Sequence, residues 1–383
     1  MKVIRLKLAA LGAAVLLAAC GGGDSGVDFS SMVSFGDSLS DVGTYRVGTV
    51  AAVGGGRWTV NGPAASNWTE LVAAQAGTGV PCAAQTGLLA NIPGVQGAPV
   101  TDMPGCRNYA QGSARVSVPY APNAAALQAA PFNQVNLGLM ATPVAVQMSR
   151  HLANVGGAYE GSELVTVMAG GNDLFMHLNG VNNAAAGGPR AIAAAVAAGW
   201  PQDVQAAVAP GGPAAVSAAA TAAVNGMGQA GAELAGLIKT QVLEKGAKHV
   251  VVVNLPDVSQ TPFALGLDPQ SRELVNTMVT TFNSQLQAGL GGTGVLLVDA
   301  YSRGREQLAN PGQFGIGNAT SPACSPTSPA NPLQGSSLGC TAASTVAADT
   351  SGYLFADTVH STPLGYRLLA DGVLAQMRAA GWL

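Results

Sequence analysis

The sequence predicts an α/β protein built on a parallel sheet. Short apolar runs bounded by turn residues recur at wide intervals along the chain, and segments with a helical spacing of apolar residues lie between them. This alternation is typical of a sheet made of βα units. The runs are continuous and rich in β-branched residues rather than alternating with polar ones, so we expect helices to cover both faces of the sheet.

Four of these apolar runs are the expected strands. They occupy residues 32–35, 163–170, 249–255 and 294–300. A further strand is expected within residues 105–116, where the pattern does not fix its bounds.

Helices are expected before two of the strands and at the end of the chain. Residues 232–249 carry apolar side chains at helical spacing and contain Gly246 as a C-terminal stop. Residues 274–290 repeat this arrangement before the last strand, and residues 362–383 predict a closing helix.

The alanine-rich stretch of residues 182–223 is different in kind. Two Gly-Gly-Pro sequences interrupt it, and we expect weakly specified helices that elaborate the core. No repeat of fixed period and no linker divides the chain, so residues 31–383 are expected to form a single domain.

The N-terminal segment predicts export. Residues 1–19 combine basic residues with an apolar run too short to span a bilayer, as in a signal peptide. The segment leads into Leu-Ala-Ala-Cys, which resembles the lipobox of bacterial lipoproteins, and this resemblance makes Cys20 a lipidated N-terminal residue. Residues 20–30 would then hold the lipidated cysteine and a flexible tether. An ordinary secretory signal with a chance cysteine is the alternative.

The charge of the chain excludes a nucleic-acid-binding protein. Charged residues make up 10% of the sequence, against about 25% in typical soluble domains, and the formal net charge is −3. No basic cluster stands out that could bind phosphates. Beyond the signal segment, no apolar run reaches the ~20 residues needed to cross a membrane.

Four cysteines remain after Cys20, and in an exported protein they favour two disulfides. Three pairings are possible, and proximity along the chain favours Cys82 with Cys106 and Cys324 with Cys340. A metal site is not expected, because no Cys-x-x-Cys is present and no histidine lies near a cysteine.

His360 is the histidine best placed for acid–base chemistry. Asp357 lies three residues before it, and a carboxylate there could orient the imidazole and stabilise its charged form. The alternative is a plain helix start, with Ser361 or Thr362 as the cap and Pro363 in the first turn.

Ser38 is the candidate nucleophile. It follows an apolar strand and Gly36 directly, where ligands bind in open α/β sheets. The alternative is again structural, because Ser38 and Asp41 also fit a capping box at the start of a helix.

A third polar residue at a strand end is Asn172, in Gly-Gly-Asn-Asp. Its amide could donate to a substrate oxyanion, or it could simply cap the next helix. Ser337 formally matches the Gly-x-Ser-x-Gly nucleophile motif, but no strand precedes it, so we do not expect it to be catalytic.

Taken together in this order, these segments resemble the GDSL esterase and lipase family of the SGNH hydrolase superfamily. "SFGDSLSDVGTY", "NYAQGSARV", "GGND" and "FADTVHSTPLGYRLLAD" are similar to four of the family's conserved blocks. The resemblance implies a three-layer α/β/α sandwich, flavodoxin-like, with about five parallel strands. It also implies that no metal or organic cofactor takes part.

Carried over to this chain, the resemblance implies a catalytic triad and an oxyanion hole. Ser38 would be the nucleophile, His360 the general base and acid, and Asp357 the residue that orients it. The backbone N–H groups of Ser38 and Gly112 and the side chain of Asn172 would bind the oxyanion.

The function expected from the sequence is an exported, lipid-anchored serine carboxylester hydrolase, acting on small-molecule or lipid esters at the cell envelope, most simply at the outer membrane. A polysaccharide or sugar O-acetylesterase, or an acyltransferase, is an alternative of the same superfamily, in which Trp58, Trp68 and Phe175 could line an acceptor site. A surface-binding lipoprotein without catalysis is an alternative of another class.

Overall fold

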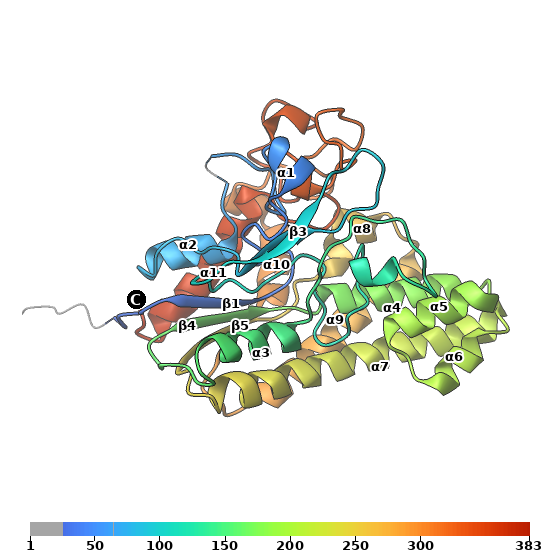
Figure 1. The fold of residues 1–383 in the computed structure, drawn as a ribbon, viewed down its shortest axis with the longest axis horizontal. Helices are drawn as coiled ribbons and strands as arrows, with labels where there is room; N and C mark the ends of the chain where they lie inside the picture. The colour runs from blue at the N-terminus through green and yellow to red at the C-terminus, as the bar shows by residue number, and fades with distance from the viewer. Residues whose placement is uncertain (1–25, 64) are drawn as a thin grey trace, which may run out of the picture.

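A parallel sheet of four strands forms the centre of the computed structural model, which describes residues 26–63 and 65–383 (Figure 1). The strands lie in the order β1-β4-β5-β6, with parallel pairing throughout. Their bounds are Met32–Gly36, Leu164–Met168, His249–Val253 and Leu296–Val298. All four fall within or next to the apolar runs that predicted them.

The expected fifth strand is not a regular strand. Residues 107–111 run alongside β1, where the Ser34 N–H donates to the Arg107 carbonyl and the Ser34 carbonyl accepts from the Tyr109 N–H. The pairing stops because the chain turns after Gln111, whose carbonyl accepts from the Ala114 N–H. The expectation of about five strands is thus corrected to four strands plus one extended segment.

This segment nevertheless completes a known strand order. Numbered along the chain, β1 is followed by the 107–111 segment, β4, β5 and β6, and their spatial order is 2-1-3-4-5. That is the flavodoxin-like order, in which ligands bind at the carboxyl ends of the strands where the order reverses. The reversal here lies between β1 and β4.

Helices cover both faces of the sheet (Figure 1). In β4, Val165 and Val167 point into a large cluster with one set of helices, whereas Leu164 and Met168 point to the other set. All four side chains are buried, which explains the continuous apolar pattern. The first set is α3 (Val144–Asn154), α4 (Gly171–Ala184), α7 (Gly212–Ile238) and α9 (Pro269–Leu290), and the second is α2 (Trp68–Gln75) and α11 (Pro363–Ala379).

The helix expected before β5 is present as the end of a longer one. Residues 232–249 hold the end of α7 and a π-helical turn, Lys239–Leu243.

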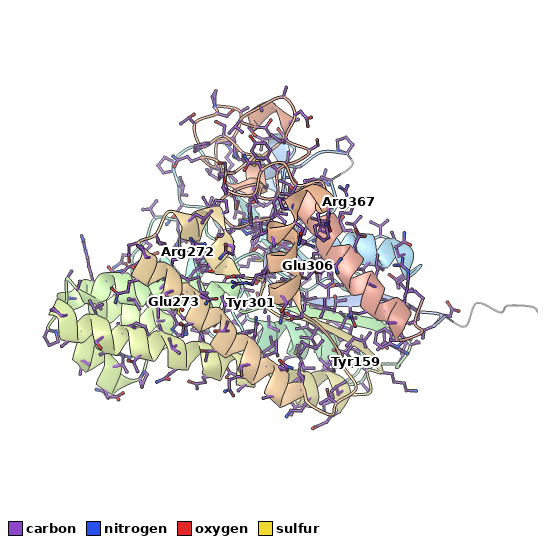
Figure 2. All side chains as sticks on the ribbon, turned by 180° about the vertical axis from the view of Figure 1, so that it is seen from behind. Tyr159, Arg272, Glu273, Tyr301, Glu306 and Arg367 are labelled. Carbon is purple, nitrogen blue, oxygen red and sulfur yellow. A yellow bond between two sulfur atoms is a disulfide. The ribbon has the colours of Figure 1, made fainter. Side chains whose placement is uncertain are left out.

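The remaining elements are short. The small elements are α1 (Gly48–Ala52), α8 (Pro262–Leu265), α10 (Ala300–Ala309) and the hairpin of β2 (Gln85–Leu88) and β3 (Ala98–Asp102). Tyr301 of α10 lies against α9 (Figure 2), where its hydroxyl donates to Asn276 over 2.7 Å.

The alanine-rich region forms helices, as expected. It holds the end of α4, then α5 (Gly188–Ala198), α6 (Gln202–Val208) and the start of α7. Each Gly-Gly-Pro sequence starts a helix, with Gly187 and Gly211 at positive φ and a proline in the first turn. The small alanine side chains of α5, many of them buried, allow it to pack closely on its neighbours.

Both disulfides form as chain proximity predicted, between Cys82 and Cys106 and between Cys324 and Cys340. Of the described residues, no helix is long and apolar enough to cross a membrane.

The described part of the expected tether, residues 26–30, packs on the domain. Residues 1–25, including the signal segment and Cys20, lie outside the described residues. Residues 26–30 are not a free tether, because the Val27 N–H donates to the Trp382 carbonyl and Phe29 is buried against Trp382 and His249. The packed domain therefore includes residues that we expected to lie in the tether.

Candidate active site

Ser38 lies on a tight turn at the carboxyl end of β1. At Gly36 the two strands approach so closely that an added Cβ would lie 2.3 Å from the Met168 carbonyl oxygen of β4. Gln147 of α3 fixes the same residue, since its side chain accepts from the Gly36 N–H over 2.9 Å and donates to the Gly36 carbonyl over 2.8 Å. The turn is thereby held rigid from both sides.

The capping-box interpretation of Ser38 and Asp41 is wrong, because no helix begins at Ser38. The chain makes successive turns there, and the next helix, α1, starts at Gly48. Asp41 instead accepts from the backbone N–H groups of Gly43 and Thr44 over 2.9 and 2.8 Å. The carboxylate closes a turn rather than a helix end, and no helix dipole acts on Ser38 from this segment.

His360 and Asp357 lie beside Ser38 in a continuous chain of hydrogen bonds. His360 Nε2 is 2.8 Å from Ser38 Oγ, and His360 Nδ1 is 2.8 Å from Asp357 Oδ2. The helix start predicted as the alternative is also present, because Thr362 caps α11 by accepting from the Gly365 N–H. The two interpretations are compatible: His360 ends the loop and Thr362 begins the helix.

Asp357 is held as a carboxylate. Burial opposes its charge, but the facing His360 and several hydrogen bonds hold its pKa well below its usual range. Its oxygens accept from the backbone N–H groups of Val359, His360 and Ser337 over 3.0, 2.8 and 3.0 Å. With its lone pairs fixed in this way, the carboxylate favours the tautomer of His360 that carries its proton on Nδ1.

The expectation for Gly112 is corrected. Its backbone N–H donates to Asp41 Oδ2 over 3.0 Å and is not free for a substrate. A glycine is needed here for another reason, because an added Cβ would lie 2.4 Å from the Trp58 ring. That ring in turn lies over the His360 ring, with centroids 4.8 Å apart.

The backbone N–H of the next residue, Ser113, is the donor that remains free. Within the described part of the chain, no group accepts from its backbone N–H, and Ser113 lines the cleft that contains Ser38. Its φ of 66° is in the left-handed region, which is uncommon for a residue with a side chain. Such a backbone at a functional site is consistent with a strained turn that presents an N–H to a ligand.

Asn172 is the second residue of α4, at the carboxyl end of β4. Its side-chain amide donates to the Ala114 carbonyl over 3.0 Å, and it lines the same cleft as Ser38. One N–H of the amide is thus used to fix its orientation, and the other remains to contact a ligand. The neighbouring Asp173 ties α4 to the loop through a buried ion pair with Arg115 at 2.8 Å.

A second carboxyl group, Asp37, adjoins Ser38 in the chain. Burial, with a smaller contribution from Asp173, raises the pKa of Asp37 from 3.8 to about 7, against the lowering effects of the Leu39 N–H and His360. Burial therefore favours the uncharged form of this carboxyl group.

The cleft above these residues has a volume of about 1270 Å³. Trp58 and Phe175 line it, as expected, but Trp68 does not, because it is fully buried in the core between α2 and the sheet. Among the described residues, no group of three or more His, Cys, Asp and Glu side chains could hold a metal ion.

Comparison with known proteins adds the decisive observation. The family model of GDSL-like lipases and acylhydrolases matches residues 32–373, which is nearly all of the described chain. The chain belongs to the GDSL lipase/acylhydrolase family. The α/β fold described above, with its parallel sheet between two sets of helices, is thus the fold of a GDSL family member.

Individual relatives of this GDSL family member match over shorter stretches. A GDSL esterase/lipase of Arabidopsis thaliana is 25% identical over 36% of this chain and 40% of its own length. Esterase EstA of Pseudomonas aeruginosa is 33% identical over 33% of this chain and 19% of its own length. The chain thus spans less than half the length of these curated relatives. A solved extracellular lipase from Streptomyces rimosus aligns over 92% of this chain and 99% of its own, with 15% identity and a TM-score of 0.35.

Some residues of the GDSL site escaped prediction from the sequence. Gln147 reaches the site from a segment with no motif of its own, whereas Ser113 and Ser337 lie in motifs from which these roles were not expected. The hydroxyl of Ser337 is buried, and its backbone N–H supports Asp357. The positive φ of Ser113 had no signal in the sequence.

Proposed function

We propose that this GDSL hydrolase is a serine carboxylester hydrolase that uses Ser38, His360 and Asp357 as a catalytic triad. The observation that carries the proposal is the unbroken chain of hydrogen bonds, 2.8 Å from Ser38 Oγ to His360 Nε2 and 2.8 Å from His360 Nδ1 to Asp357. This arrangement of nucleophile, base and orienting acid activates a serine near neutral pH.

In the first half of the reaction, Ser38 Oγ forms a bond to the ester carbonyl carbon while its proton moves to His360 Nε2. The carbonyl oxygen becomes an oxyanion, bound by the backbone N–H groups of Ser38 and Ser113 and by the amide of Asn172. When the tetrahedral intermediate collapses, the bond to the alcohol breaks, and His360 gives its proton to the leaving oxygen.

In the second half, water attacks the acyl group on Ser38. His360 takes a proton from that water, a second tetrahedral intermediate forms at the same oxyanion site, and Ser38 recovers its proton as the acid leaves. Asp357 stays ionised throughout and stabilises the positive charge on His360 in both halves.

We also propose that the protein is exported and anchored to the cell envelope by lipid on Cys20, most simply at the outer membrane. The lipobox-like end of the signal segment supports this. Membrane fractionation tests it: Cys20→Ser should move the protein from the membrane fraction to the soluble fraction, because the acyl chains provide the anchor. Equal membrane retention of both forms would reject the anchor.

The catalytic proposal is tested by Ser38→Ala, with Ser337→Ala as the matched control. The control removes a hydroxyl that is buried, has no hydrogen-bond partner among the described residues, and belongs to the other serine motif. We expect Ser38→Ala to abolish hydrolysis of a chromogenic short-chain ester and labelling by a fluorophosphonate, and Ser337→Ala to keep both. Labelling that persists in Ser38→Ala, or no labelling of the wild type, would reject the triad.

A further inference from the structure

The cleft is much larger than the catalytic residues require. A typical small-molecule site has a volume of about 300–1,000 Å³, whereas this cleft reaches about 1270 Å³. An acetyl group would fill a small part of it. The lining residues, which differ in chemistry from one part of the cleft to another, therefore indicate which part of a larger substrate each region could bind.

One arm of the cleft follows α4 away from the catalytic residues. The lining side chains of α4 are Asn172 at the end near Ser38, then Phe175, Met176, Leu178 and Asn179, then Asn182 and Asn183, which follow helical spacing. They therefore lie on one face of the helix. Because the helix rises 1.5 Å per residue, the stretch from Asn172 to Asn179 is about 10 Å long.

The other walls of this arm come from α5 and from the loop of residues 119–137. Figure 1 shows α4 and α5 side by side at one end of the molecule. From α5, Ala193, Ala194 and Ala197 line the arm, and from the loop, Leu127 and Phe132. These side chains are apolar, and the alanines leave open space where larger residues would fill the arm. The same loop also lines the cleft with Asn123 and Gln134.

The chemistry changes about two turns along α4. Beyond Leu178, the lining side chains of α4 are the amides of Asn179, Asn182 and Asn183, and α5 contributes Arg190. The walls that α4 and α5 give to the near part of the arm are thus largely apolar, and those of the far part are polar. An apolar chain would gain from burial only as far as the beginning of the polar part.

The part of the cleft lined by α8, α10 and the loop that carries His360 is mixed in chemistry. Asp257, Gln260, Arg303 and Gln307 are polar, whereas Phe263, Leu308, Phe355 and Val359 are apolar. Only the arm along α4 and α5 changes from apolar to polar along its length.

We infer that the arm along α4 and α5 binds the acyl chain, and that the preferred substrates are esters of medium-chain fatty acids. This inference rests on the proposed function and names its substrate class. The apolar near part of the arm is about 10 Å long and limits the length of acyl chain that can be buried. Carbons that reach the asparagines beyond it add no further binding free energy from burial. Acetylated sugars would leave the apolar part of the arm empty.

The chain-length profile of the wild-type enzyme is the first measurement. With one leaving group throughout, acetyl, butanoyl, octanoyl, dodecanoyl and hexadecanoyl esters are compared by kcat/KM. Each fully buried methylene raises kcat/KM by roughly fourfold. We expect a steep rise from acetyl to octanoyl and no further gain at dodecanoyl and hexadecanoyl.

Two variants then test the arm itself. Ala193→Phe fills it beyond Met176, and we expect at least a tenfold loss with the octanoyl ester and less than a twofold change with the acetyl ester. Asn179→Leu extends the apolar part, and we expect a gain with the dodecanoyl ester. Ala206→Phe, at an exposed position of α6 outside the cleft, is the matched control and should match the wild type on every ester.

The outcomes separate this inference from the proposed function. A wild type that hydrolyses the acetyl ester through Ser38 but shows no gain with chain length would overturn the acyl arm and leave the triad standing. Equal losses on all esters in Ala193→Phe would also overturn it, and so would a dodecanoyl gain absent from Asn179→Leu. A wild type that hydrolyses none of the esters would instead reject the proposed function.

Discussion

The Cys324–Cys340 disulfide should matter for catalysis as well as for stability. Ala356, the residue before Asp357, packs against both cysteines, and the Cys324 N–H donates to the Ala356 carbonyl over 2.8 Å. Cys340 also ends the short turn that contains Ser337, whose N–H donates to Asp357. Removing the disulfide therefore loosens two supports of the Asp357 carboxylate at once.

The magnitude for stability follows from loop closure. The two cysteines are 16 residues apart, and a loop of that size loses about 3 kcal/mol of stabilisation when the bond is removed. The other disulfide, Cys82–Cys106, closes 24 residues and should cost about the same. Removing either disulfide should therefore cost a similar free energy of unfolding, so a difference in activity between the two variants reports on the position of the bond.

The experiment compares two double variants, Cys324→Ala with Cys340→Ala and Cys82→Ala with Cys106→Ala. Urea unfolding should show a loss of about 3 kcal/mol in each. At a temperature where both are folded, kcat for a short-chain ester should fall by about tenfold or more only in the first variant, because Asp357 no longer holds His360 in position. Equal kcat in the two variants would refute this account of the disulfide.

Three further predictions concern single residues. Asn172→Ala should lower kcat by about 100- to 1,000-fold with little change in KM, because the amide acts on the oxyanion; a change confined to KM in steady-state kinetics would count against this role. Ser113→Gly should keep kcat and raise the free energy of unfolding by about 1 kcal/mol, because glycine tolerates the φ of 66°; a large loss of kcat would assign the role to the hydroxyl instead of the N–H. His151 is fully buried among aromatic rings, and burial lowers its pKa from 6.5 to about 4. Because this pKa is lower in the folded than in the unfolded state, the stability contributed by neutral His151 is complete above pH 6.5 and is lost as pH falls toward 4. Between pH 7.5 and pH 4.5, the free energy of unfolding of the wild type should therefore fall by about 2–3 kcal/mol more than that of His151→Leu. Equal falls for the two proteins in urea unfolding would contradict the shifted pKa.

The sequence was enough to predict the central sheet and to nominate three candidate site residues that the fold brings together. Strands buried on both faces have a continuous apolar pattern that needs no knowledge of their partners. Ser38, Asn172 and His360 each adjoin a glycine turn or a helix start, and parallel strands bring such positions to one edge of the sheet. Local sequence was therefore enough to nominate them.

The errors have a shared physical cause. Gly112 and Ser113 are adjacent, and only the packing of Trp58 and the carboxylate of Asp41 decide which N–H remains free. The helix expected at Ser38 is absent because Asp41 bonds to the backbone of a turn. Both outcomes depend on contacts between distant segments, which a local pattern does not contain.

The expected fifth strand is not a regular strand for a related reason. Residues 107–111 pair with β1, yet the chain turns immediately after Gln111 to form the loop beside the nucleophile. Similarly, Phe29 lies on the domain rather than in a tether because Trp382, at the other end of the chain, covers it.

The central claim is that Ser38 carries the acyl group, and mass spectrometry of the trapped intermediate tests it most directly. The enzyme is quenched in acid during turnover of an octanoyl ester and digested, and the peptides are searched for one added acyl group. The account predicts that group on the peptide containing Ser38, and its absence in Ser38→Ala. An acyl group on another peptide, such as the one containing Ser337, or turnover that persists in Ser38→Ala, would contradict it.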